Sequence, residues 1–269
     1  MASLPIPNLP LGSPRPETDA SLPGVASLAG RAGLRPRPAA ERFHSQRGWL
    51  DSWHSFSFGG HDDPDWRGFG PLLVINDDRI EAGQGFGMHP HREMEIITVM
   101  VEGVLNHRDS IGHNASLRAG EVQRMGAGSG IVHSEINGGS EACRLLQIWI
   151  QPSHSGSSPS YGQQAFPPSE DWTLLVDPAG AGGALSIDRA VRLWRAQPRA
   201  GQGLGWPVAA AAQAWIQVIA GDVTAVVGPQ ETGVQALLQA GDGLGLGPGM
   251  AACLGAAGQG ADLLVFELR

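Results

Sequence analysis

Apolar residues occur along most of this chain in short runs of strand length, not at helical spacing. Between about residue 41 and residue 151, such runs include "GPLLVINDDRI", "EIITVMVEG" and "CRLLQIWIQP". Short apolar runs closed by turn residues predict strands, and long amphipathic helical patterns are missing. The 39 glycines and 20 prolines agree with a fold that has many turns. We therefore predict an all-β protein of the sandwich or barrel type.

Short apolar runs closed by turn residues also occur in the second half of the sequence, which predicts two β domains in one chain. The later runs include "WTLLVD", "VRLWRA" and "ADLLVFELR", and "VIAGDVTAVVG" is similar to the earlier "VMVEGVLNHRD". This similarity indicates an internal duplication at the level of a domain. A polar stretch rich in proline and serine separates the halves and predicts a linker at residues 156–171. The expected domains are residues 41–155 and 172–269.

The first forty residues differ in composition from the rest. Segments such as "LPIPNLPLGSPRP" and "GLRPRPAA" carry few apolar residues that a core could bury. They predict a flexible tail over residues 1–40. The tail lacks a basic region followed by an apolar stretch, so we do not expect a signal peptide. Because no run reaches the roughly 18 apolar residues of a membrane span, we expect a cytoplasmic protein without membrane contact.

Charge and cysteine content argue against two further classes. The formal net charge is −8 at pH 7 and no basic block occurs, which disfavours direct binding to nucleic acid. The two cysteines, Cys143 and Cys253, lie far apart in apolar surroundings. We expect buried free thiols there, because two distant cysteines cannot form a disulfide framework. We also expect a monomer.

The first candidate for chemistry is the stretch "GMHPHREMEIITVMVEG" at residues 87–103. Alternate residues of a strand share one face, so that His89 and His91 project together. Glu93 and Glu95 continue the same alternation. A single H-x-H pair is weak evidence, because solvated strand faces often alternate in this way. Either this face is exposed to water, or it holds a ligand that needs nitrogen and oxygen donors.

A second pair with the same spacing strengthens the ligand interpretation. His133 and Glu135 stand in "GSGIVHSEING", and glycines flank both pairs, as the turns at a barrel mouth require. If the two segments are neighbouring strands, three imidazoles and one carboxylate meet at one point. Such a set suits a divalent transition metal, and by affinity iron, nickel, copper, manganese and zinc are all acceptable.

The same segments resemble the two motifs of the cupin superfamily. Gly83 to Gly103 resembles the first motif and "GEVQRMGAGSGIVHSEIN" the second, although Gly126 stands where a proline is usual. Together with "RGWLDSWHSFSFGG", "EGVLNHRDSIG" and "LQIWIQP", these strings resemble the pirin family. The resemblance is dense over residues 41–167. It implies two cupin barrels of the jelly-roll type, of which the second is degenerate and holds no metal. In agreement, no histidine follows His154.

The pirin resemblance also implies a ligand set and an activity. It assigns the metal to His89, His91, His133 and Glu135, with iron first among the metals named above. Ordinary cupins use the glutamate of the first motif, so Glu95 remains the alternative ligand. The resemblance to bacterial pirins implies a quercetin 2,3-dioxygenase that takes a flavonol and dioxygen and releases carbon monoxide. Glu135 would then act as the catalytic base.

Two further points stay open at this stage. Eukaryotic pirins are regulatory proteins, so the alternative is a metal-dependent redox sensor that binds a protein partner. His107 and Asp109 either support a ligand histidine through a hydrogen bond or satisfy a turn. Phe86 and Met88 either form an apolar mouth or pack in the core. We interpret His54 as structural.

Overall fold

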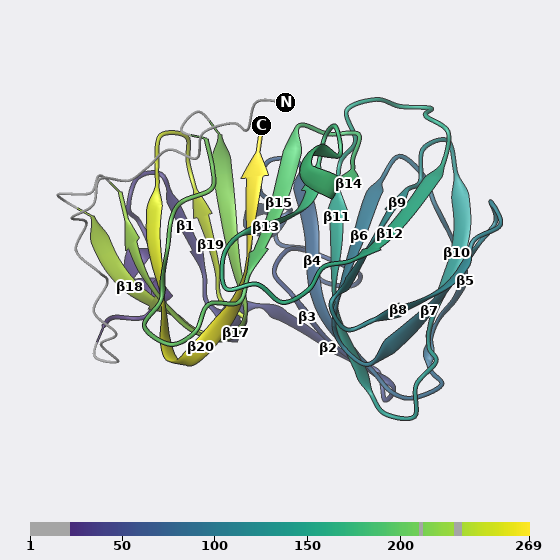
Figure 1. The fold of residues 1–269 in the computed structure, drawn as a ribbon, viewed down its shortest axis with the longest axis horizontal. Helices are drawn as coiled ribbons and strands as arrows, with labels where there is room; N and C mark the ends of the chain where they lie inside the picture. The colour runs from purple at the N-terminus through teal and green to yellow at the C-terminus, as the bar shows by residue number, and fades with distance from the viewer. Residues whose placement is uncertain (1–21, 210–211, 229–232) are drawn as a thin grey trace.

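The chain folds into two β domains that lie side by side (Figure 1). The computed structural model describes residues 22–209, 212–228 and 233–269. Within these residues the helical elements are short 3-10 turns, at Val25–Leu28, Ala39–Glu41, Pro64–Trp66 and Ala181–Gly183. None of them is long and apolar enough to cross a membrane. The predicted all-β class is confirmed.

The N-terminal domain consists of two antiparallel sheets. The larger sheet has seven strands in the order β12-β9-β6-β11-β4-β3-β2. In that order they are Ser160–Ala165, Glu121–Gly126, Glu95–Glu102, Cys143–Ile150, Leu72–Ile80, Leu50–His54 and Phe43–Gln46. The smaller sheet has the order β5-β10-β7-β8, with strands Gly85–His91, Ile131–Asn137, Val104–Asp109 and Asn114–Arg118. The two predicted ligand pairs therefore lie on β5 and β10, which are hydrogen-bonded neighbours.

The stretch that contains His89 and Glu95 is not one strand. It is divided between β5 of the smaller sheet and β6 of the larger sheet. The break includes Glu93, which has a φ of 52°, a left-handed conformation that is rare for a residue other than glycine. The histidine pair and the glutamate pair therefore do not continue along one face, contrary to the expected alternation.

Both faces of the seven-stranded sheet are buried, which explains its uninterrupted apolar runs. On β6, Ile97 and Val99 belong to an apolar cluster that also contains Leu264 and Phe266 of the C-terminal domain. The intervening Thr98 faces the interior of the N-terminal domain, where it hydrogen-bonds to the smaller sheet. One face of this sheet thus joins the two domains and the other lines the N-terminal barrel.

The described part of the C-terminal domain forms a sheet of nine strands. Seven of them follow the order β1-β19-β17-β20-β15-β13-β14, while β16 pairs with β20 and β18 with β17. In the same sequence, the nine are Leu34–Arg37, Gly243–Leu246, Gln213–Val227, Ala252–Leu268, Val191–Ala196, Thr173–Asp177, Leu185–Ser186, Gly203–Leu204 and Val234–Leu238. The two longest strands, β17 and β20, change register beside Gly221. These bulges let the sheet bend around a core of its own.

That core is aliphatic. Its buried members include Ile216, Val218, Leu244, Leu263 and Val265, each at most 1% exposed. The strong polar pairs of this domain lie outside the cluster, as Arg195 with Asp262 illustrates. The C-terminal barrel is therefore filled by apolar packing.

Two of the predicted boundaries are wrong. Residues 34–37 of the expected tail form β1, which pairs with β19 in the C-terminal domain, since backbone hydrogen bonding does not require an apolar side-chain pattern. The expected linker contains β12, which pairs with β9 and extends the N-terminal sheet. Val25–Leu28 of the expected tail form a 3-10 turn whose Val25 and Leu28 are buried, and residues 1–21 lie outside the described residues.

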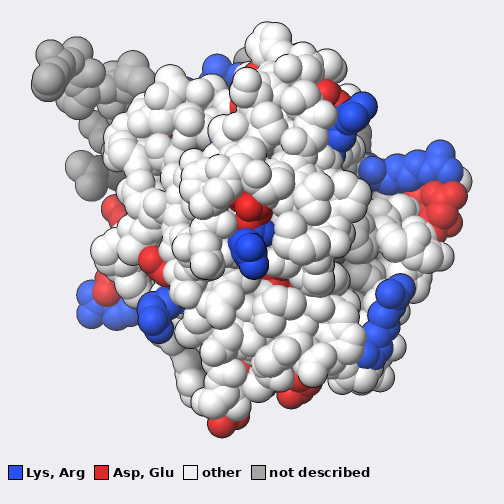
Figure 2. All heavy atoms as spheres, turned by 90° about the vertical axis from the view of Figure 1, so that its right-hand side faces the viewer, with Lys and Arg blue, Asp and Glu red and all other residues white. Residues whose placement is uncertain are grey.

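The end of the molecule that carries the smaller sheet shows few charged side chains (Figure 2). Arginines and acidic residues are scattered among uncharged atoms, and the described residues on this face gather no large patch of one sign. A basic groove is the usual requirement for nucleic-acid backbones. On this face, the described residues gather no basic patch of that kind.

Candidate metal centre

Three histidines from the two neighbouring strands converge. His89 on β5 stands directly opposite His133 on β10, and His91 follows two residues later on the same side of β5. The ring centroids are 4.4 Å apart for His89 and His133, 4.9 Å for His91 and His133, and 4.8 Å for His89 and His91. One ring nitrogen from each lies within 4.8 Å of the others. The predicted pairing of the two histidine segments is therefore present.

A glycine makes this close approach possible. Gly85, at the start of β5, has a φ of 153°, and a Cβ atom there would lie 2.2 Å from the carbonyl oxygen of Glu135. Any larger residue would push β5 away from β10. Gly85 thus fixes the spacing between the two ligand strands.

The nitrogen atoms of these histidines are available to a metal. His133 is fully buried, and neither of its ring nitrogens has a hydrogen-bond partner among the described residues. Buried polar atoms are rarely left unpaired, so this is an observation that needs an explanation. On His89 the Nδ1 atom bonds to the carbonyl oxygen of Gly87 at 2.7 Å, which turns its Nε2 atom to the site.

Burial also keeps two of the imidazoles neutral. Desolvation, with the neighbouring His89 as a smaller cause, lowers the pKa of His91 to about 4. Desolvation and the surrounding histidines lower the pKa of His133 to about 3. Neutral imidazole is the form that coordinates a metal, since its free lone pair is the ligand. The donor set therefore fits a divalent transition metal on the chemistry of its own residues.

Glu135 is held by three side chains that reach across the barrel from the larger sheet. Its Oε1 atom accepts from Thr98 Oγ1 at 3.2 Å and from Gln123 Nε2 at 3.3 Å, and its Oε2 atom accepts from Gln147 Nε2 at 2.7 Å. Complete burial raises the pKa of Glu135, and the hydrogen bonds from Thr98 and Gln147 oppose that rise. The carboxylate is thus fixed in orientation inside a largely dry interior.

The three donors belong to a row of polar residues that crosses the larger sheet. Successive members stand opposite each other on adjacent strands, from β3 through β4, β11 and β6 to β9. The row consists of His54, Asn76, Gln147, Thr98 and Gln123, all of them buried. Apolar clusters lie on both sides of it, one around Met100 and one around Met125. A polar belt therefore runs through an otherwise apolar barrel.

Glu135 belongs to a different group from His89 and His91. Its oxygens lie within 4.8 Å of nitrogens of His133 and His107, which makes a second set of possible ligands. The two sets share His133. The four predicted ligand residues therefore line one region, with the three histidines as its compact part and Glu135 beside His133.

Glu95, the alternative ligand, points elsewhere. Arg124 engages both of its oxygens, through Nε at 2.5 Å and Nη2 at 2.7 Å. This pair faces a different pocket, which also contains His154 and Asp188. Glu93 accepts from the backbone N–H of Gly156 at 2.9 Å. The suggested role of Glu95 beside the metal is therefore wrong, since its carboxylate is already neutralised in a buried ion pair.

The turn interpretation of Asp109 is confirmed, whereas the expected hydrogen bond to a ligand histidine is not present, since both ring nitrogens of His133 lack a partner among the described residues and His89 Nδ1 bonds to Gly87. Asp109 accepts from the backbone N–H groups of Ile111 and His113, which closes the turn, and it also bonds to His107 Nε2 at 3.0 Å. His107 is buried, its ring centroid lies 5.5 Å from that of His133, and its Nδ1 atom has no partner within the described chain. Asp109 thus orients a buried histidine that borders the metal region.

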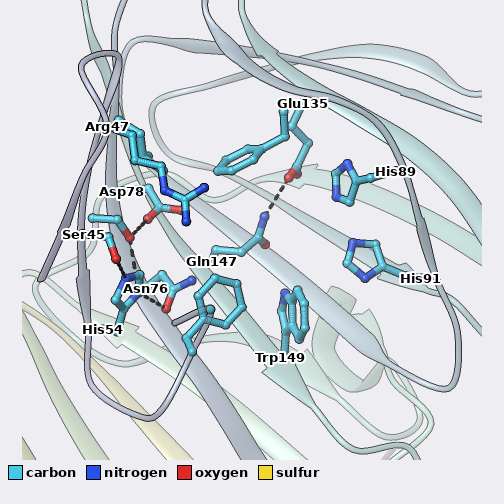
Figure 3. Close-up of a pocket in the computed structure, with 15 residues that line it drawn as sticks. Ser45, Arg47, His54, Asn76, Asp78, His89, His91, Glu135, Gln147 and Trp149 are labelled. Carbon is cyan, nitrogen blue, oxygen red and sulfur yellow. Dashed lines mark hydrogen bonds between the residues drawn. The ribbon is translucent and has the colours of Figure 1, made fainter. Parts of the chain in front are cut away.

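A cavity of about 290 Å³ opens beside the histidines. His89, His91 and Glu135 line one part of it (Figure 3). Phe86, Phe58 and Trp149 supply apolar walls. Met88, the other residue considered for the mouth, is 56% exposed and is not among the lining residues. The cavity has a volume at the lower end of the range for small-molecule sites.

Sequence reasoning missed the opposite wall. Ser52, Asn76 and Asp78 line the same cavity, together with His54, which we interpreted as structural. The signal is present in the sequence, because "NDD" at residues 76–78 falls inside the apolar run "GPLLVINDDRI". These residues lie within β4. Polar residues inside a strand that is buried on both faces indicate a site rather than a turn.

Comparison with known proteins agrees with this architecture. The family model described as Pirin matches residues 36–150, and the one described as quercetinase C-terminal cupin domain matches residues 174–268. A curated quercetin 2,3-dioxygenase of Escherichia coli K12 is 46% identical over 189 residues, which cover 70% of this chain and 82% of that protein. A putative quercetin 2,3-dioxygenase of Zymomonas mobilis is 50% identical over 131 residues, 49% of this chain and 56% of that one.

A solved structure extends the similarity to the whole fold. The bacterial pirin YhhW from Escherichia coli, in complex with nickel(II), superposes with a TM-score of 0.79 at 40% identity. The match covers 88% of this chain and 99% of that one. The two β domains described above are accordingly cupin domains, and this chain belongs to the pirin family.

Proposed function

We propose that this protein is a metal-dependent dioxygenase that opens flavonols such as quercetin, consumes dioxygen and releases carbon monoxide. The observation that carries the proposal is the convergence of three histidines beside a cavity, with both ring nitrogens of the buried His133 without a hydrogen-bond partner among the described residues. The curated relatives named quercetin 2,3-dioxygenase support the choice of reaction. The same cavity has apolar walls that suit a flat aromatic molecule.

His89, His91 and His133 would hold one divalent transition-metal ion, and Glu135 would complete the set. The nickel complex of a related pirin supports a first-row metal, and iron remains the alternative that the sequence favoured. When bound, such an ion supplies a Lewis acid that acidifies a coordinated hydroxyl group and a centre for reaction with dioxygen. The neutral state of His91 and His133 keeps their lone pairs available for it.

Glu135 would accept the proton of the flavonol 3-hydroxyl group. Thr98, Gln123 and Gln147 fix the direction of its carboxylate, which a general base requires. Because burial raises its pKa, the carboxylate is a stronger base than a solvated glutamate. Phe86 and Trp149 would position the rings and exclude water from the reacting centre.

Replacing Glu135 by glutamine tests this assignment. The amide is nearly isosteric but cannot take the proton, so we expect kcat on quercetin to fall by about 100-fold or more. The measurement is oxygen uptake by metal-loaded protein, with the metal content determined in the same samples. Glu95→Gln is the matched control, because Glu95 faces Arg124 instead of the cavity. Full activity of Glu135→Gln would remove Glu135 from the chemistry.

A further inference from the structure

The cavity beside the histidines has two polar ends. His89, His91 and Glu135 form the first, and Gln147 and Trp149 lie between it and the second (Figure 3). The second end consists of Ser45, Arg47, Ser52, His54, Asn76 and Asp78. Nothing in the proposed chemistry uses this far end, although Ser52, His54, Asn76 and Asp78 are buried there.

The far end is organised by hydrogen bonds around His54. The Nδ1 atom of His54 lies 2.8 Å from Asn76 Oδ1, and its Nε2 atom lies 2.9 Å from Ser45 Oγ. Ser52 donates to Asp78 Oδ1. Both Asn76 and Asp78 are at most 3% exposed. The network fixes the orientation of both side chains, because each has one oxygen engaged within the wall.

Each of these two side chains keeps one polar group for the cavity. The side-chain NH2 group of Asn76 and the Oδ2 atom of Asp78 have no hydrogen-bond partner among the described residues, and both residues line the cavity. Both atoms are accessible from the cavity, since neither is among the inaccessible polar atoms that lack a partner, and a ligand that displaces water there must replace the hydrogen bonds of that water. If the network were purely structural, both groups would have hydrogen-bond partners within the cavity wall. Their position at the cavity surface indicates that a ligand is their partner.

We propose that this far end binds hydroxyl groups of the substrate that are remote from the reacting centre, through Asn76 and Asp78. This inference rests on the proposed function and names its specificity-determining residues. An amide donor beside a carboxyl group matches a phenolic hydroxyl, which both accepts and donates a hydrogen bond. Burial raises the pKa of Asp78 to about 7, so that near neutral pH this carboxyl group offers either role. Arg47 lies exposed at the rim.

The same geometry discriminates against substrates without such hydroxyl groups. A ligand that fills the cavity but offers no partner leaves the Asn76 and Asp78 groups dehydrated and unpaired. Sites built to hydrogen-bond a hydroxyl group reject the analogue that lacks it for this reason. We therefore expect the KM for quercetin to be roughly tenfold lower than the KM for 3-hydroxyflavone, which keeps only the reacting hydroxyl group.

The test compares these two substrates in Asn76→Leu and Asp78→Asn. Asn76→Leu removes the amide donor at similar volume, and Asp78→Asn alters the carboxyl group while an oxygen remains for Ser52. In either variant the KM ratio of the two substrates should fall from roughly tenfold to about twofold, with the change in KM and not in kcat. Asn114→Leu is the matched control, because Asn114 is exposed on β8. A ratio that stays at the native value in both folded variants would overturn the inference.

A binding experiment distinguishes failure of this inference from failure of the proposed reaction. Quercetin and 3-hydroxyflavone are titrated into the full-length protein after metal removal by a chelator and again after loading with nickel. Quenching of tryptophan fluorescence reports occupancy, since Trp149 lines the cavity. If no flavonol is turned over but the Kd ratio falls in the variants, the reaction fails and the recognition site stands. If turnover occurs with equal KM for both compounds, the recognition site fails alone.

Discussion

The two barrels share one architecture but have opposite interiors. The N-terminal barrel contains a belt of buried polar residues and a cluster of three histidines between two apolar clusters. The C-terminal barrel is filled by aliphatic side chains such as Ile216, Leu244 and Leu263. A buried polar group weakens a fold unless it is paired, whereas a buried aliphatic group stabilises it directly. The candidate metal centre therefore lies in the N-terminal domain, whereas aliphatic packing fills the C-terminal domain.

The domain interface connects these two roles. The sheet from which Thr98 and Gln147 donate hydrogen bonds to Glu135 packs its other face, including Ile97 and Ile148, against residues of the C-terminal domain. A strand that is buried on both sides has little freedom to shift. The aliphatic domain therefore supports the rigidity of the polar wall that orients Glu135.

The largest expected effect comes from His133, at the centre of the polar interior. In His133→Ala we expect bound metal to fall below about one-tenth per chain and turnover to fall by roughly 1000-fold, because His133 belongs to both ligand sets. Metal analysis and oxygen uptake measure the two effects. His154→Ala is the control, since this exposed histidine only pairs with Asp188. Equal losses in both variants would contradict the localisation of the chemistry.

A medium effect is expected from the aliphatic interior. Ile216→Ala removes a fully buried side chain and should lower the free energy of unfolding by about 2–4 kcal/mol. Chemical denaturation measures this loss. Metal content per folded chain should stay at the native level, because Ile216 is in the other barrel. Loss of metal from folded Ile216→Ala protein would show that the two interiors are not separate in function.

The smallest expected effect is a pH dependence that only the polar interior supplies. The pKa of Asp78 is raised to about 7, above the ordinary 3.8, because burial disfavours its charge. The folded state thus holds this proton more tightly, and its stabilising contribution is lost as pH rises from about 4 to about 7. Asp78→Asn lacks this dependence. Its stability relative to the native protein should therefore be about 1–2 kcal/mol higher at pH 8 than at pH 5.

Thermal unfolding of both proteins at the two pH values measures this difference. His91 and His133 also titrate below their ordinary range, with stability lost as pH falls, but both proteins contain them and their effect cancels. A relative stability that is independent of pH would place Asp78 in contact with water.

Much of this organisation could be predicted from the sequence. Strand-length apolar runs gave the all-β class and the two domains, and the spacing of His89, His91 and His133 identified residues that the fold brings together. Local spacing is sufficient there because side chains two apart on a strand share a face. Spacing along the chain does not determine which strands are neighbours, and the pairing of β5 with β10 was therefore only a condition of the metal hypothesis that the structure fulfils.

The errors have a common physical cause, since each depended on long-range pairing. The side chain of Glu95 is directed away from the site by Arg124, a partner 29 residues away. Asn76 and Asp78 form a wall only because β4 lies between β3 and β11. Residues 34–37 are ordered by β19, some two hundred residues away in the chain. Sequence patterns indicate the conformation that a segment prefers locally, whereas these features depend on the distant segments that pack against it in the fold.

The central claim is that one metal ion binds at the histidine cluster of the N-terminal barrel. The most direct measurement is anomalous scattering from crystals of the nickel-loaded protein. We predict one strong peak per chain, within about 2.1 Å of a ring nitrogen of each of His89, His91 and His133. A peak in the C-terminal barrel, or no peak within reach of these three histidines, would contradict the account.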